Sequence, residues 1–341
     1  MKRNICLLFL LLLLTGCYSK NTISEVEDNY NRSFYKVYEP YKSQAKNNYA
    51  TNRLFNRYDL REVEMGLMRI STNYFVPTKY YYQAGQYLTK DVLDTLLSSS
   101  KLNKVDTELD YQPRYISYLH EQNYLNINGE LKGISIALIL NPYQSYTDVN
   151  NKVKQVIVSE DELITFGQVK ARELLAYIRD ELKLKDIEIV IGLYIQQSTN
   201  SMIPGSYVYE TFTREQTITK FNKLDEQYYL LASSDLKTVD INTYDAVNQF
   251  KNKIQSLDNV ISTIGRGLYI NKQLQELSID VSVNYMSIGE VNSLAQIIAQ
   301  EILTLFNDHI IIEVTIRTDN KIEAIISKDD NQDKCKIFFI N

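Results

Sequence analysis

The sequence predicts an α+β protein in which a helical N-terminal segment precedes two tandem ββαββ-like repeats with mainly antiparallel sheets. Two stretches of strand-like alternation align with each other, and an amphipathic helix follows each of them. Both observations favour a helix packed on a sheet in each copy, because a helix with one apolar face needs a sheet face to cover. A hydrophobic content of 44% agrees with a globular protein.

The chain begins with a segment typical of a bacterial lipoprotein signal. Lys2 and Arg3 precede the ten-residue apolar run Ile5–Leu14. Ten residues reach about 15 Å as a helix, roughly half of a bilayer core, so we expect a cleaved signal peptide. The following Leu14-Thr15-Gly16-Cys17 resembles a lipobox. It implies diacylglyceryl transfer to Cys17 and cleavage after Gly16 by a lipoprotein-processing peptidase; the alternative is an ordinary signal that happens to end in cysteine.

The charge balance limits the partners of the exported chain. Lys and Arg number 37 against 42 Asp and Glu, a formal net charge of −5. A nucleic-acid binder needs a basic face to neutralise phosphates, so we expect no nucleic acid among the partners. We expect the lipid on Cys17 to hold the protein on the extracellular face of the cell membrane, since two acyl chains give stable anchoring.

The N-terminal part of the mature chain divides into a polar tether, residues 17–52, and a helical segment, residues 53–112. Apolar residues recur at helical spacing from Leu60 to Tyr74, and Pro77 ends that pattern. Thr89 is a candidate N-cap for a second short helix.

The first repeat is expected over residues 113–213 and the second over 260–341, joined by a polar, partly helical connector, 214–259. Leu131–Asn141 aligns with Leu274–Asn284, and both stretches alternate in polarity. Asn128-Gly129 predicts a type I′ hairpin turn, and Asn271-Lys272-Gln273 is a weaker turn signal. The helices carry apolar residues at the same spacing: Ala171, Leu174, Leu175, Ile178 and Leu182, against Val291, Leu294, Ala295, Ile298 and Ile302.

Each expected helix begins with a capping-box sequence, Ser159 to Glu162 and Ser287 to Glu290. Two strands follow each helix, at Ile187–Tyr194 and Ser206–Thr213 in the first copy. In the second copy they are expected at Ile310–Ile316 and Lys321–Ser327.

No residue pattern points to catalysis, a metal or a cofactor. His120 and His309 are the two histidines, and we expect structural roles for both and no enzyme activity. The sequence has neither a Cys-x-x-Cys pair nor a His-Glu-x-x-His motif, so we expect no metal site. The candidate ligand-binding residues are Arg266, which two glycines flank, and those of a loop and a turn: Tyr143, Tyr146, Pro204 and Gly205.

Several segments resemble the CamS-type sex-pheromone lipoprotein precursors of low-GC Gram-positive bacteria. They include Tyr80–Leu88, Ile189–Tyr194, Asn200–Gly205 and Ile264–Tyr269, and they run in order through most of the mature chain. The resemblance implies that the signal peptide is itself a product, trimmed after lipobox cleavage to a short apolar signalling peptide within Leu7–Gly16. It implies no reaction for the folded part. The alternative is a cell-surface module that binds a peptide or a glycan.

Overall fold

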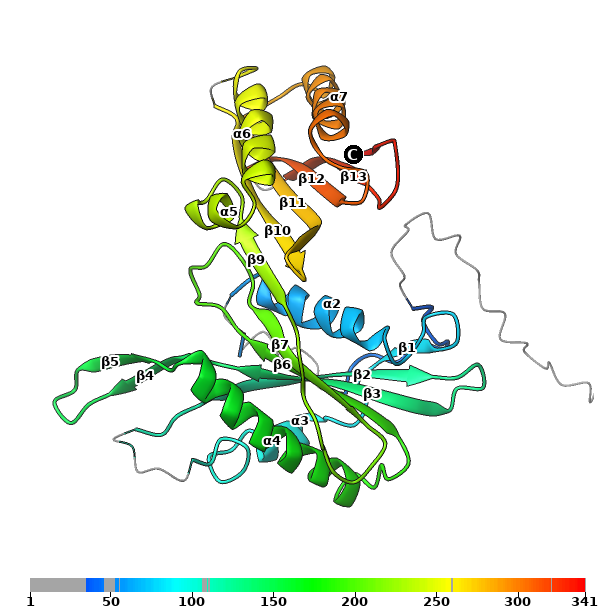
Figure 1. Ribbon diagram of the computed structural model, residues 1–341, viewed down its shortest axis with the longest axis vertical. Coiled ribbons are helices and arrows are strands. Elements are labelled where there is room, and N and C mark those ends of the chain that lie inside the picture. Colours follow the sequence, from blue (N-terminus) through cyan, green and yellow to red (C-terminus); the bar gives the residue numbers. More distant parts are fainter. Residues whose placement is uncertain are drawn as a thin grey trace, which may run out of the picture.

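The computed structural model describes residues 35–45, 53–54, 56–105, 109, 111–258, 260–319 and 321–340. The expected signal peptide, the lipobox residues Leu14, Thr15 and Gly16, and Cys17 lie outside the described residues, as do residues 18–34 and 46–52 of the expected tether. The described chain forms two units, each built on a six-stranded sheet, with helix α2 (Asp59–Ser71) lying between the two sheets (Figure 1).

The first sheet has the strand order β1-β2-β3-β6-β7-β8. Its strands are β1 (Tyr81–Ala84), β2 (Ile116–Leu125), β3 (Leu131–Leu140), β6 (Glu188–Ile195), β7 (Ser206–Thr213) and β8 (Asn222–Lys223). Among these pairs, β3 and β6 run parallel and the others antiparallel. Helix α4 (Glu160–Asp180) makes the crossover between the parallel strands, and α3 (Lys90–Leu96) follows β1.

The second sheet repeats this pairing pattern in the order β9-β10-β11-β12-β13-β14. Its strands are β9 (Glu226–Leu230), β10 (Ser262–Ile270), β11 (Gln273–Val283), β12 (Ile311–Thr318), β13 (Lys321–Lys328) and β14 (Lys336–Phe339). Again the third and fourth strands are the parallel pair, with α7 (Ile288–Leu305) as the crossover. Helices α5 (Ser234–Val239) and α6 (Ile241–Gln255) precede β10. The α+β class and the mainly antiparallel sheets are thus confirmed.

The two sheets also share two irregularities, and the first has another at Ser117 in β2. Lys132 is the extra residue of a bulge between β2 and β3, and Gln275 is the extra residue between β10 and β11. Val208 and Glu323 bulge in the same way between the next antiparallel pairs. In the alignment of the two copies these positions are equivalent. The superposition of the two copies in space stays a prediction.

The predicted N-caps Thr89, Ser159 and Ser287 are formed, but only the second of the two predicted capping boxes is complete. The Thr89 side chain accepts a hydrogen bond from the Val92 amide, and Ser287 and Glu290 form both halves of a capping box. Ser159 caps α4 through the Glu162 amide, whereas the Glu162 carboxylate accepts from the Tyr115 hydroxyl at 3.1 Å.

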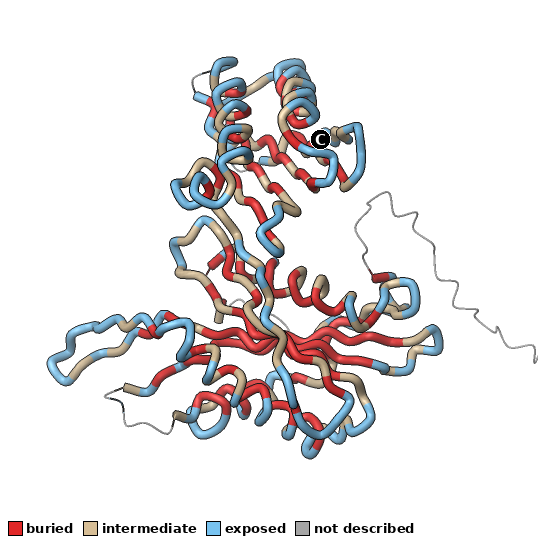
Figure 2. Tube along the Cα trace, viewed as in Figure 1, coloured by how far each residue is buried: buried red, intermediate tan, exposed pale blue. Residues whose placement is uncertain are grey.

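The two sheets differ in how they are covered. Helix α4 packs on one face of the first sheet and α2 on the other, so β3 is buried along nearly its whole length (Figure 2). In the second sheet α6 and α7 lie on one side, and buried and partly exposed residues alternate along β11. Among the described residues, no helix packs on the other face of the second sheet.

Both predicted hairpin turns are present, but the type I′ turn lies at the weaker signal and not at the stronger one. Asn271 and Lys272 both have positive φ, 52° and 64°, as a type I′ turn requires. At the stronger signal, Gly129 has φ 77° while Asn128 does not have positive φ, and Asn126 donates its amide to the Glu130 carbonyl. This is a three-residue loop closed by a glycine bulge, so the type I′ prediction at Asn128-Gly129 was wrong.

Two segments that the sequence suggested to be a tether and a connector contribute to the folded units. In residues 35–45 of the expected tether, Tyr35 is buried against Tyr124 and Val37 bridges to Tyr82 beside β1. The later part of the expected connector supplies β9, α5 and α6 to the second unit. Within the described ranges, the helices are all too short or too polar to cross a membrane.

Candidate functional site

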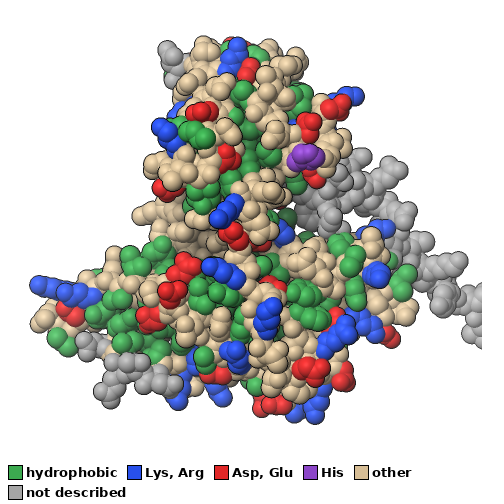
Figure 3. Space-filling model, in the orientation of Figure 1, with side chains coloured by type: hydrophobic (Ala, Val, Ile, Leu, Met, Phe, Trp, Pro, Cys, Tyr) green, Lys and Arg blue, Asp and Glu red, His purple; other side chains and the backbone are tan. Residues whose placement is uncertain are grey.

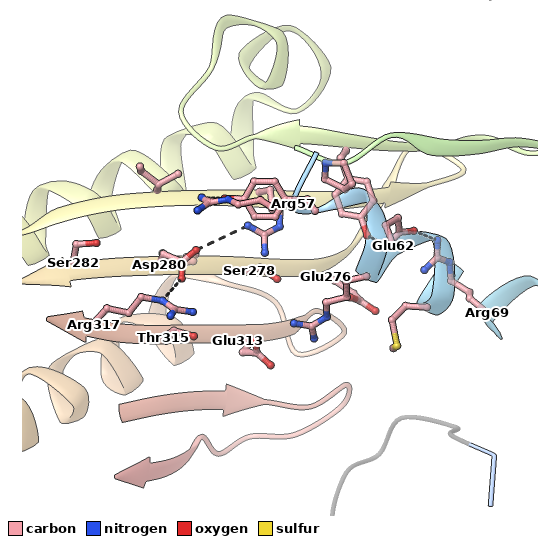
Figure 4. Close-up of a pocket in the computed structure, with 18 of the residues that line it drawn as sticks. Arg57, Glu62, Arg69, Glu276, Ser278, Asp280, Ser282, Glu313, Thr315 and Arg317 are labelled. Atoms are coloured by element: carbon pink, nitrogen blue, oxygen red, sulfur yellow. Dashed lines mark hydrogen bonds and ion pairs between the residues drawn. The ribbon is translucent and has the colours of Figure 1, made fainter. Parts of the chain in front are cut away.

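A cleft of about 600 Å³ lies between helix α2 and the uncovered face of the second sheet. Figure 4 shows side chains from the helix and from strands β10, β11 and β12 converging on it. From α2 and the residues before it the lining takes Arg57, Tyr58, Arg61, Glu62, Met65 and Arg69. The β6–β7 loop adds Pro204, and β9 adds Tyr228.

The floor of the cleft is the polar face of strands β11 and β12. On β11 the floor residues are Glu276, Ser278, Asp280 and Ser282, while the residues between them point to the core. Alternate side chains of a strand point to opposite faces, so this sequence folds into a sheet with one dry and one polar side. Glu313, Thr315 and Arg317 of β12 continue the polar side.

The charges in the cleft are mixed and balanced. Its described lining contains five arginines and five carboxylates. Arg317 donates from Nε to Asp280 Oδ1 at 3.0 Å, and Arg266 Nη1 lies 4.0 Å from Asp280 Oδ2. Within the described part of the chain, Glu276 and Glu313 take part in no ion pair, so their charges remain available to a ligand. Figure 3 shows acidic and basic side chains together at the narrow waist between the two units.

One aromatic ring holds two cations at the mouth of the cleft. The guanidinium carbon of Arg57 lies 4.5 Å from the centre of the Tyr58 ring, and that of Arg266 lies 4.3 Å from it. Such contacts over an aromatic face are attractive, because the ring carries negative charge on its faces. They hold Arg266, which belongs to the second unit, against a residue of the first.

A buried ionic cluster joins the units beside the cleft. Arg69 Nη2 of α2 lies 2.7 Å from both Glu62 Oε1 and Glu226 Oε2, and the Tyr228 hydroxyl donates to Glu62. Burial raises the pKa of Glu62, and the Arg69 charge opposes that rise. Glu226 and Tyr228 lie on β9, so the cluster fixes α2 to the first strand of the second sheet.

Asp59 fixes the other side of the cleft. Its carboxylate accepts from the Tyr194 hydroxyl at 2.7 Å and from the amides of Gly205 at 2.8 Å and Gln197 at 3.1 Å. Burial raises the pKa of this carboxyl, whereas the three hydrogen bonds lower it by a smaller amount. A Cβ atom at Gly205 would lie 1.8 Å from the Ile195 carbonyl oxygen, so only glycine fits there. The neighbouring Pro204 is thereby held at the cleft wall.

The structure separates the sequence-predicted candidates into two groups. Arg266 and Pro204 line the cleft, and Gly205 supports it from beneath. Tyr143 and Tyr146 lie on a separate arm, formed by β4 (Tyr143–Thr147) and β5 (Val153–Ile157), whose end projects from the first unit (Figure 1). Tyr146 stacks on Tyr111 with ring centres 4.6 Å apart.

Most cleft residues were missed because they come from distant parts of the sequence. Arg57, Tyr228 and Arg317 have no common motif, and only the fold brings them together. A signal was present nevertheless: β3 has a continuous apolar run from Ile136 to Leu140, whereas the aligned β11 alternates with charged and polar residues. That contrast indicates a sheet covered on both faces in one copy and on one face in the other.

The histidines lie away from the cleft lining. His120 is buried in β2, and His309 is exposed with Nδ1 3.9 Å from Asp330 Oδ1. Among the described residues no group of three His, Cys, Asp or Glu side chains has the geometry to hold a metal ion. The absence of enzyme activity stays a prediction.

The comparisons with known proteins come from a family model and from solved structures. The model described as CamS sex pheromone cAM373 precursor matches residues 41–334. The fold is similar to that of a sex pheromone precursor from Lactobacillus salivarius subsp. salivarius UCC118, with a TM-score of 0.81 and 24% identity over 88% of this chain and 93% of that one. It is also similar to the C-terminal domain of the sex pheromone staph-cAM373 precursor from Staphylococcus aureus. That match has a TM-score of 0.75 and 23% identity over 85% of this chain and 98% of the other.

The comparison with curated proteins found no significant match. The two structural matches support the fold, and the family model spans both units together with the cleft between them. The chain therefore belongs to the CamS sex pheromone cAM373 precursor family.

Proposed function

We propose that this chain is a lipid-anchored extracellular lipoprotein whose folded part is a binding module that takes its ligand in the cleft between the units. The anchor is the diacylglyceryl group on Cys17, and the removed segment supplies a short apolar peptide from within Leu7–Gly16. The lipobox sequence Leu14-Thr15-Gly16-Cys17 and the membership of a pheromone-precursor family support the first part of the proposal.

The observation that carries the binding function is the uncovered face of the second sheet. In the first sheet the equivalent face holds α2: the Phe75 ring lies over Gly133, and the Tyr207 hydroxyl donates to the Val63 carbonyl at 2.6 Å. The second sheet has Glu276 at the position equivalent to Gly133, and no described helix covers it. Ligand sites are commonly found in concave regions between two structural units.

The processing part of the proposal can be tested with Cys17→Ser. The thiol is the acceptor of the lipid, so the variant should be released from the membrane or keep its signal peptide uncut. Mass spectrometry of the culture medium should detect fragments of Leu7–Gly16 from the wild type and none from the variant. Normal processing and membrane retention of Cys17→Ser would rule out a lipid anchor at this residue.

The binding part can be tested by filling the cleft. Ser278 lies on the floor between Arg266 and Glu313, so Ser278→Trp should block the site. Equilibrium dialysis against a soluble digest of Gram-positive cell wall, which contains sugars, peptides and conjugates of both, should show compounds retained by the wild type and lost in Ser278→Trp. Ser293→Trp, on the exposed side of α7, is the matched control and should retain them. Equal retention by both variants would show that the cleft is not the binding site.

A further inference from the structure

We infer that the ligand of the cleft is a short extended peptide with a basic group at one end and a free carboxylate at the other. The inference rests on the proposed binding function of the cleft and names the class of ligand. The charges of the floor residues, the spacing of those charges along the strands and the contacts that occupy the aromatic rings support it.

The balance of charges argues against a polymer of one sign. Five arginines and five carboxylates line the described cleft. A polyanion such as a phosphate polymer would meet the carboxylates of Glu276, Glu313 and Asp319 without counter-charges. A polycation would meet Arg57 and Arg61 in the same way. A ligand that carries both signs can satisfy both sets, because electrostatic complementarity selects against like charges.

The signs are also sorted along the floor. Glu276 and Glu313 lie toward one end of β11 and β12, and Asp280 and Arg317 lie four residues further along the same strands (Figure 4). At the second end Asp280 is shared by two guanidinium groups, those of Arg317 and Arg266, so these three side chains together carry one net positive charge, and Asp319 lies two residues beyond Arg317.

The spacing of the two ends defines the length of the ligand. Four residues of a strand span about 13 Å, at about 3.3 Å per residue. An extended peptide of about four residues has the same reach. Its amino group or basic side chain would lie at Glu276 and Glu313, and its terminal carboxylate at Arg317 and Arg266. The hydroxyls of Ser278 and Thr315 between these ends can bond to the peptide backbone.

The aromatic residues argue against a glycan. Sugar rings are commonly bound against an open aromatic face, and among the described lining residues the aromatic ones are Tyr58 and Tyr228. The Tyr58 ring already carries the guanidinium groups of Arg57 and Arg266. Tyr228 is turned toward the buried cluster, where its hydroxyl donates to Glu62. Neither ring is presented to a sugar, so recognition by charge is the better supported mode.

The test uses calorimetric titration of the full chain, in detergent, with defined probes. The first probe is Lys-Ala-Ala-Ala with both termini free. Its matched controls are the C-terminal amide, which lacks the carboxylate, and an N-acetylated peptide with norleucine in place of lysine. Chitotetraose is the glycan probe. We expect the free peptide to bind, and removal of either charged end to weaken binding roughly tenfold, the usual value of a charge-assisted hydrogen bond.

Two protein variants assign each end of the peptide to its partner. In Arg317→Gln the free acid and the amide should differ less than they do with the wild type, because the carboxylate has lost one of its two cations and Arg266 remains. In Glu313→Gln the lysine and norleucine peptides should differ less than they do with the wild type. Glu301→Gln, on helix α7, is the control and should behave as the wild type. These comparisons are made within one variant, so a general loss of stability cannot imitate them.

The outcomes separate this inference from the proposal on which it rests. Binding of chitotetraose with no binding of the peptides would overturn the peptide ligand and leave the cleft as a binding site. Binding of the peptides with no dependence on either charged end, or unaffected by both variants, would also overturn the inference. If Ser278→Trp retains all cell-wall compounds as well, the proposed function fails with it.

Discussion

Asp59 is a buried acid whose protonation is coupled to folding. Burial raises its pKa in the folded chain above the ordinary value of about 3.9. Between the ordinary and the raised pKa the folded chain therefore binds this proton more tightly than the unfolded chain does. The contribution of Asp59 to the free energy of unfolding is largest below that window and falls as the pH rises through it.

The coupling between Asp59 protonation and folding predicts how the stability of Asp59→Asn depends on pH. Asparagine does not titrate, so the stability of the variant relative to the wild type should rise as the pH increases from about 4 through the raised pKa of Asp59. Urea unfolding at a series of pH values measures this difference. Asp161→Asn is the control, since Asp161 is exposed in the first turn of α4. A difference for Asp59→Asn that does not change with pH, or that changes in the opposite direction, would contradict the argument.

Only some of the residues in and around the cleft could be predicted from the sequence. Arg266 was identified as a candidate because two glycines flank it, and Pro204 was identified because it lies in a predicted turn. Asp59, Arg69 and Tyr228 gave no such signal, since a polar residue in a helical or strand-like pattern reads as solvent-exposed. Their roles depend on contacts with partners more than 130 residues away, such as Tyr194 for Asp59 and Glu226 for Arg69.

Among the elements, the long central strands and helices were the most predictable, because their hydrophobic periods are clear. The helices α4 and α7 and the strands β3, β6, β11 and β12 agree with prediction within about two residues. The edge strands β1, β8 and β9 were not predicted. They are short, at two to five residues, and edge strands pack on one side only, so little periodicity marks them.

The β4–β5 arm is an element that can be tested alone. In the described chain its strands pair only with each other, and Tyr146 stacks on Tyr111. Replacing residues 145–155 by an Asn-Gly turn removes Tyr146 and keeps the buried Gln144. We expect a loss of about 1 kcal/mol in the free energy of unfolding, the usual value of one aromatic pair. Chemical denaturation measures this loss.

The same shortened protein separates the two groups of candidate residues. Its binding of Lys-Ala-Ala-Ala should be unchanged within about twofold, because none of the removed residues lines the cleft. A complete loss of binding would assign the ligand to the arm and to the tyrosines, in place of the cleft.

At the scale of the molecule, the units are joined by the buried cluster of Glu62, Arg69 and Glu226. Arg69→Met leaves two buried carboxylates without their cation, which usually costs about 3–5 kcal/mol. We expect a lower midpoint and a broadened or divided transition in differential scanning calorimetry, because the units lose their connection.

The control for this variant is Arg214→Met. Arg214 pairs with Glu188, but 70% of its side chain is exposed, so its loss should cost less than about 1 kcal/mol. Similar losses for the two arginine variants, or a single sharp transition for Arg69→Met, would show that the cluster does not couple the units.

The two sheets can have different roles, because helices cover the first on both faces and the second, in the described chain, on one face only. In the second sheet α6 and α7 already cover the side that forms the core. Side chains on the other side point away from it, since neighbours along a strand alternate between faces. That surface is therefore free to diverge residue by residue, so a new specificity can evolve there while the scaffold beneath it stays intact.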